Sequence, residues 1–112
     1  MRGYAGSERR QFPRIACILQ TDYSPLGLIG SCDHSRTINI SLGGVLLRTG
    51  DSFKKSQPLV LIIRLPHNQT AVTIMSEVVW QKRIPNSVMN EIGIKFLQLD
   101  SALNQFIEDK LR

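Results

Sequence analysis

Short runs of alternating apolar and polar residues follow one another along most of this chain. The clearest run is 59–65, where Leu59, Leu61, Ile63 and Leu65 lie on one face. This period of two is typical of a strand with one buried side. Similar runs occupy 15–20, 36–40, 45–48, 70–80 and 92–96, with turns expected at Tyr23–Gly27 and Pro66–Gln69. Many short strands joined by turns favour an all-β barrel or sandwich.

The period changes near the C-terminus. Leu103, Phe106, Ile107 and Leu111 follow the spacing of one helical face. Asp100 or Ser101 is a suitable N-cap, so we expect a helix over 100–111. The 112 residues are enough for one domain. The expected architecture is therefore six antiparallel strands followed by one helix.

Positive charge is concentrated at the start of the chain. The net charge is +5, and residues 1–14 hold four arginines against one glutamate. Arginine pairs well with phosphate, so the charge is compatible with a phosphate-bearing partner, although on charge alone a solvated tail is the favoured explanation. We expect a flexible lead over 1–8, an arm over 9–14, and a barrel over 15–99.

Several classes of protein are not expected. No apolar stretch approaches the roughly 20 residues of a membrane span, and residues 1–14 lack the apolar segment of a secretory signal, so we expect a cytoplasmic protein. Two cysteines and two histidines complete no zinc spacing, so no metal or cofactor is expected. Asp33, His34 and Ser41 have no nucleophile elbow around them, so we expect no catalytic residues and no enzyme.

The first motif is the pair Arg10 and Arg14. Pro13 disfavours a helix here, and in an extended chain residues four apart share one side at roughly 13 Å. The two arginines are then able to hold a ligand of that width between them. Phe12 lies between them, either as a stacking surface or as part of the core.

The second motif is Asn39-Ile40-Ser41-Leu42-Gly43-Gly44. Asn39 and Ser41 are expected on one strand face, with Ile40 directed into the core. An amide and a hydroxyl suit the edge of a purine, and Gly43 and Gly44 allow a ligand to approach the backbone. A simple hairpin turn with polar outer residues is the alternative.

Together, Arg-x3-Arg and the later Asn-x-Ser-x-x-Gly resemble the signature of the PilZ domain family. Val79-Trp80 and Ile92–Phe96 are similar to the late strands of that family. The resemblance covers residues 9–112 and implies a six-stranded antiparallel β-barrel with a C-terminal helix. It also implies that the chain binds cyclic di-GMP, a bacterial second messenger with two phosphates and two guanines.

The resemblance also assigns roles within the site. Arg10 and Arg14 would clamp phosphates and guanine edges, and Asn39 and Ser41 would bond the other guanine. Gly44, with Gly43, would leave room for the ligand. Arg9 would serve a stacked pair of ligand molecules in place of one. The interpretation of Trp80 stays open between a surface that stacks on guanine and a core side chain.

The implied function is that of a receptor without catalysis, which relays the messenger by conformational change to an effector protein in trans. One alternative is a PilZ-like adaptor that binds no nucleotide. A barrel that binds single-stranded nucleic acid is less favoured, because that mode needs several exposed aromatics and aromatic residues are only 6% of the chain. We therefore expect no DNA or RNA partner.

Overall fold

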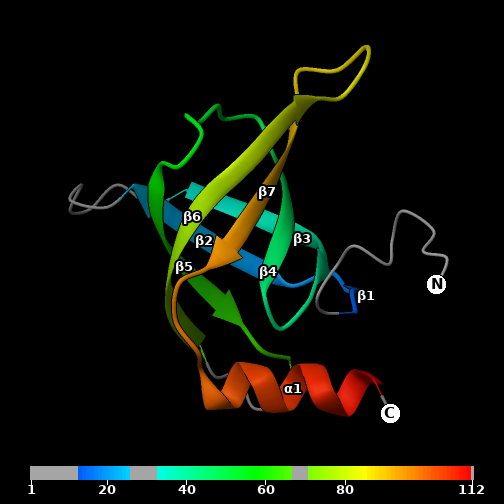
Figure 1. Ribbon diagram of the computed structural model, residues 1–112. Helices are drawn as coiled ribbons and strands as arrows, with labels where there is room; N and C mark the ends of the chain where they lie inside the picture. Colours follow the sequence, from blue (N-terminus) through cyan, green and yellow to red (C-terminus); the bar gives the residue numbers. More distant parts are fainter. Residues whose placement is uncertain (1–12, 26–32, 67–70, 112) are drawn as a thin grey trace, which may run out of the picture.

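The computed structural model describes residues 13–25, 33–66 and 71–111. The predicted lead 1–8, with Arg9, Arg10 and Phe12, lies outside these described residues, and so do residues 67–69 of the turn expected after Pro66. The expected barrel with a C-terminal helix is confirmed (Figure 1). The described part of the chain forms β1 (Ile15–Ala16), β2 (Gln20–Pro25), β3 (Asp33–Ile40), β4 (Gly44–Thr49), β5 (Pro58–Arg64), β6 (Ala71–Arg83), β7 (Asn90–Phe96) and α1 (Ser101–Leu111).

The sheet curls around on itself with every strand pair antiparallel. Its strand order is β1-β3-β2-β5-β6-β7-β4, and a further pairing of β3 with β4 joins its two sides. Both β1 and β2 run along the same strand, β3. The run 15–20, predicted as one strand, is therefore interrupted at residues 17–19. Because β1 and β2 pair with the same strand, the described residues form seven strands where six were expected.

Thr37 bridges the interruption between β1 and β2. Its hydroxyl donates to the carbonyl oxygen of Cys17 at 2.6 Å and accepts from the backbone nitrogen of Leu19 at 2.9 Å. Thr37 is buried, and buried backbone groups that lack partners cost free energy. The side chain thus replaces the ladder hydrogen bonds that the break removes.

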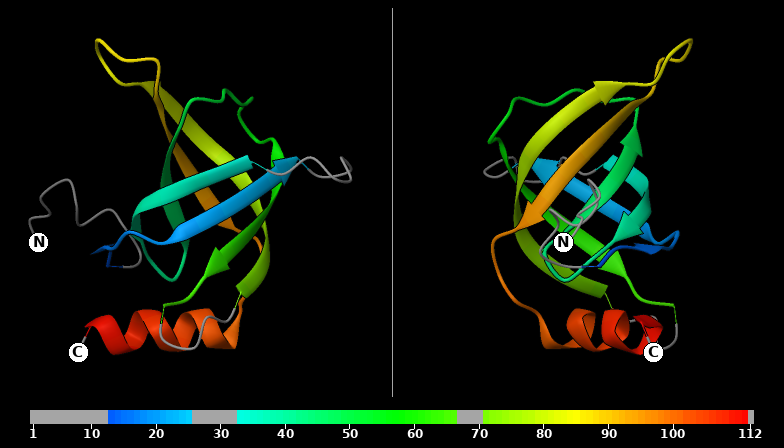
Figure 2. Two further views of the ribbon diagram at one scale, coloured as in Figure 1. Left: turned by 180° about the vertical axis from the view of Figure 1, so that it is seen from behind. Right: turned by 45° about the vertical axis from the view of Figure 1, so that its right-hand side comes forward.

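The core fills the barrel and continues to the helix. Figures 1 and 2 show α1 lying across one end of the barrel, while the β6–β7 hairpin extends at the other end. Asp100 caps the helix, since its Oδ1 accepts from the backbone nitrogen of Leu103 at 3.0 Å, as predicted. Leu111 is 44% exposed, so the predicted apolar face ends before it. The buried apolar residues are Leu19, Tyr23, Ile40, Val45, Leu47, Leu59, Leu61, Ile63, Leu65, Val72, Ile74, Val78, Ile92, Ile94, Leu103, Phe106 and Ile107.

The prediction of a turn beginning at Tyr23 is wrong. Tyr23 lies in β2, which pairs with β5 as far as Pro25. Its ring is buried and packs edge-on against Phe53, with ring centroids 5.4 Å apart. Its hydroxyl bonds to Thr49 and to Asp51. Pairing and buried partners outweigh the turn preference of the local sequence.

Asn90 holds the segment after β4 to the base of the β6–β7 hairpin. Its Nδ2 donates to the carbonyl oxygen of Asp51 at 3.0 Å, and its Oδ1 accepts from Nε of Arg83 at 3.2 Å. Asn90 is buried, and both the nitrogen and the oxygen of its side-chain amide are hydrogen-bonded. With the Tyr23 hydroxyl, it gives the barrel end away from α1 a polar, hydrogen-bonded closure.

Candidate functional site

The described parts of the two sequence motifs meet on the outside of the barrel. Nη1 of Arg14 donates to Oδ1 of Asn39 at 2.7 Å. The contact follows from the pairing of β1 with β3, which sets Ala16 opposite Asn39. Both side chains are half-buried. Because guanidinium only donates hydrogen bonds, the amide oxygen of Asn39 is the atom that faces Arg14.

A β-bulge directs Asn39 outward. The β3–β4 register shifts between Thr37 and Asn39, so that Thr37 lies opposite Leu47 and Asn39 opposite Leu46. Without the extra residue, positions two apart would share one face. With it, Thr37 is buried in the barrel, while Asn39 lies on the opposite face of the strand from buried Ile40. The polar face predicted for Asn39 is confirmed.

A second bulge in β6 decides the position of Trp80. Regular alternation along the strand predicted over 70–80 puts Val78 and Trp80 in one phase, yet the β6–β7 register shifts between these two residues. Val78 is buried, whereas Trp80 is 42% exposed. The shared phase is therefore wrong, and so is the interpretation of Trp80 as a core side chain. The physical reason is the extra residue, Val79, which moves Trp80 to the outer face.

The two bulges align their residues on one line across the sheet. Asn39 lies opposite Leu46, Leu46 opposite Gly93, and Gly93 opposite Trp80. We call these four residues, on β3, β4, β7 and β6, the outer row. Three strand spacings separate its ends, which is about 14 Å measured along the curved sheet. Leu46 and Gly93 were missed from the sequence, although a glycine inside an apolar strand is a signal of close approach.

Ser41, Gly43 and Gly44 form the tight turn between β3 and β4. The backbone nitrogen of Ser41 donates to the carbonyl oxygen of Gly44 at 2.9 Å, and Oγ of Ser41 accepts from the backbone nitrogen of Gly43 at 3.2 Å. Ser41 is buried. A Cβ at Gly44 would lie 2.1 Å from the carbonyl oxygen of Ile94. Glycine at 44 therefore permits the close approach of β4 to β7.

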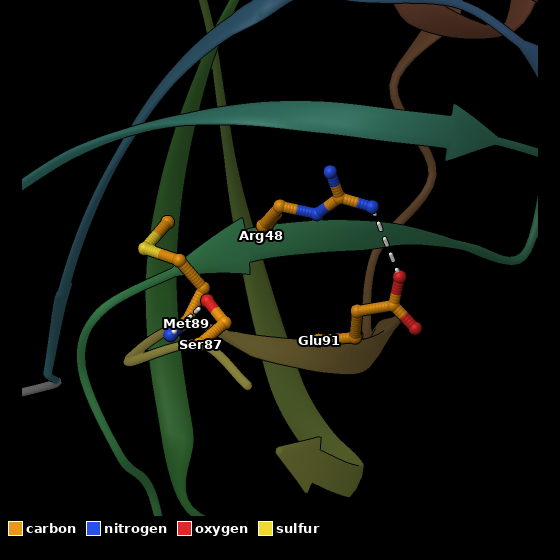
Figure 3. A network of polar contacts seen from close by, with 4 residues as sticks. All are labelled: Arg48, Ser87, Met89 and Glu91. Carbon is orange, nitrogen blue, oxygen red and sulfur yellow. Dashed lines mark hydrogen bonds and ion pairs between the residues drawn. The ribbon is translucent and has the colours of Figure 1, made fainter. Parts of the chain in front are cut away.

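Ion pairs flank the outer row on both sides. Nη2 of Arg48 lies 3.3 Å from Oε2 of Glu91, on neighbouring β4 and β7 (Figure 3). On the other side, Nζ of Lys95 lies 3.4 Å from Oε1 of Glu77. Each of these cations has a carboxylate beside it, which reduces its attraction for a phosphate. Arg14 is the arginine that the described site brings next to Asn39.

The described residues offer neither a metal site nor a membrane-spanning helix. No three or more histidine, cysteine, aspartate or glutamate side chains gather there in a way that would hold a metal ion. Within the same residues, no helix has the length and apolar character needed to cross a bilayer.

Comparison with known proteins identifies a family and a fold. The family model described as PilZ domain matches residues 8–112. No curated protein matches the chain significantly.

Solved structures share the architecture at low sequence identity. The inhibitor of motility MotI of Bacillus subtilis has a TM-score of 0.76 at 23% identity, covering 92% of this chain and 51% of that one. The PilZ domain of YcgR from Escherichia coli, solved with cyclic di-GMP, has a TM-score of 0.66 at 12% identity, with 89% and 86% covered. The MrkH complex with cyclic di-GMP from K. pneumonia has a TM-score of 0.67 at 19% identity, with 92% and 51% covered. The chain thus spans about half the length of MotI and MrkH.

Proposed function

The chain belongs to the PilZ domain family, and we propose that it is a cytoplasmic receptor that binds cyclic di-GMP. Two of its structural neighbours, YcgR and MrkH, are complexes with this ligand. The observation that carries the proposal is the 2.7 Å hydrogen bond from Arg14 to Asn39. It joins the two half-motifs on one surface, as a ligand that contacts both would require.

The ligand-binding residues of the proposal are those that the two motifs supply. Arg10 and Arg14 clamp phosphates and guanine edges, a task that suits a planar fork of donors. Asn39 and Ser41 bond the second guanine, and Gly43 leaves the backbone accessible. Gly44, which is buried against β7, supports the site only through the turn. Arg9 supports a stacked pair of ligand molecules, if two bind. No further cofactor is proposed.

Trp80 supplies a stacking surface in this proposal. It is 42% exposed and lies in the outer row with Asn39. Every base has a π-face that stacks on an aromatic ring, while its edges are polar and need hydrogen-bond partners. A row with an amide at one end and an indole at the other offers both kinds of contact.

We propose no chemical step. Binding would order the arm over the barrel and change the surface shown to a partner protein in trans, which is a shift of population between two states. The proposal includes neither DNA nor RNA as a partner.

Isothermal titration calorimetry with cyclic di-GMP tests the proposal. GMP and cyclic di-AMP are the ligand controls, and Arg10→Ala and Arg14→Ala are the protein variants. Micromolar or tighter binding that is selective for cyclic di-GMP and lost in both variants is expected. Absence of heat at several temperatures, with a folded protein, would refute the receptor function. The stoichiometry separates one bound molecule from a stacked pair.

A further inference from the structure

The indole of Trp80 occupies the space that a side chain at position 93 would need. A Cβ built on Gly93 would lie 2.2 Å from Nε1, 2.4 Å from Cε2 and 2.7 Å from Cδ1 of Trp80. Gly93 and Trp80 are directly opposite in the β6–β7 register. Residues on either side of Gly93, Ile92 and Ile94, face the core. The indole therefore lies over the outer face of β7 at Gly93.

This contact has a structural explanation that must be separated from a functional one. Glycine inside a strand weakens it, and an aromatic residue on the neighbouring strand compensates by covering it. This structural explanation accounts for the contact between Trp80 and Gly93. It does not explain why the contact lies in the same row as the motif residue Asn39. The covered glycine lies in the outer row, between Leu46 and Trp80. Asn39, the motif residue beside Arg14, begins the same row.

We propose that Gly93 is a positioning residue of the nucleotide site, an inference that rests on the proposed function. Without a side chain at 93, the indole of Trp80 lies down on the β7 backbone and keeps one surface towards solvent. A guanine stacks on that surface, and half-buried Leu46 forms the apolar floor between the indole and Asn39.

The obstacle at position 93 is a movable ring, which makes the inference testable. An added methyl group at Gly93 meets only side-chain atoms of Trp80 among its nearest neighbours. An exposed ring can turn away without breaking the strand pairing. Gly93→Ala should therefore leave the fold intact and lift the indole out of the outer row. Gly50→Ala is the matched control, because a Cβ there comes no closer than 4.0 Å to Sδ of Met89.

Trp80 is the single tryptophan of the chain, so intrinsic fluorescence reports on this ring alone. The experiment compares wild type, G93A, G50A, W80A and W80A/G93A in the full chain. Cyclic di-GMP affinity is measured by calorimetry and tryptophan emission by fluorescence, with circular dichroism as the test of folding. Removing the stacking of one base on an aromatic ring should lower the binding affinity on the order of tenfold.

We expect G93A and W80A each to lower the affinity on the order of tenfold, and G50A to change it little. G93A should also shift the emission of Trp80 in the free protein. In the W80A background, G93A should have no further effect, because Gly93 acts only through the ring. An equal loss from G93A in both backgrounds would overturn the inference, as would full affinity in W80A.

If G93A does not fold, W80A still tests whether the indole contributes to binding. Trp80 is at the surface, so its truncation should leave the fold intact. If wild type binds no cyclic di-GMP, the receptor function fails, and the inference with it. If wild type binds and W80A binds equally well, only the positioning role is refuted.

Discussion

Replacing Gly44 with alanine is expected to destabilise the barrel strongly, even though the change adds a single methyl group. The new Cβ would lie 2.1 Å from the carbonyl oxygen of Ile94 and 3.1 Å from Cα of Lys95. A carbon and a carbonyl oxygen normally stay about 3.3 Å apart. The shortfall is therefore about 1.2 Å relative to that contact. Both obstructing atoms are backbone, so β4 and β7 must separate.

The magnitude follows from what this separation disrupts. Overpacking a close-packed site costs about 1–3 kcal/mol. The hydrogen bond from the backbone nitrogen of Phe96 to the carbonyl oxygen of Gly43, at 2.9 Å, lies beside the clash, and losing it adds about 1 kcal/mol. We expect the free energy of unfolding to fall by about 2–4 kcal/mol, from a total of about 5–15 kcal/mol for a domain.

Urea unfolding followed by far-ultraviolet circular dichroism measures this loss. Gly50→Ala is the control, because the same methyl group meets only Sδ of Met89 at 4.0 Å. Removing glycine's extra freedom in the unfolded chain should leave that variant unchanged or slightly more stable. If the unfolding free energies of the two variants differ by less than about 1 kcal/mol, the steric explanation of Gly44 is refuted.

Three further changes test other parts of the molecule. Thr37→Val removes the hydroxyl that pairs with Cys17 and Leu19, so thermal unfolding should show a loss of about 2–4 kcal/mol, and Thr37→Ser should keep most of the stability; equal losses would contradict this role. Tyr23→Phe removes one buried hydroxyl with two side-chain partners and should cost about 1–2 kcal/mol in urea, whereas an unchanged midpoint would argue against the polar closure. Arg14→Lys keeps the charge but loses the planar fork, so calorimetry should give at least about tenfold weaker binding of cyclic di-GMP, and wild-type affinity would exclude a bidentate role.

Much of the fold could be read from local patterns. The alternation along 59–65 predicted a strand with one buried face, and β5 has Leu59, Leu61 and Ile63 fully buried. The change of period near the C-terminus predicted the helix, and Asp100 caps it as expected. Both signals depend on residues a few positions apart, since strand faces and helix caps are set by the local backbone.

The candidate site was only partly predictable. The spacing of Arg10 with Arg14 and of Asn39 with Ser41 indicated a phosphate and purine ligand, but it did not show which residues meet. The contact between Arg14 and Asn39 joins residues 25 positions apart. Leu46 and Gly93 lie outside both ligand-binding motifs, and they enter the site only because β4 and β7 lie between β3 and β6.

By itself, the sequence determined the strand segments from β3 to β7, where the helix begins and which side chains favour the interior. The tertiary structure decided where the alternation fails. Bulges in β3 and β6 bring Asn39 and Trp80 onto one outer row, and pairing with β5 extends β2 through Tyr23, which the sequence assigned to a turn. The physical reason is that a bulge or a strand end depends on the register with a partner strand, and register is a property of two distant segments together.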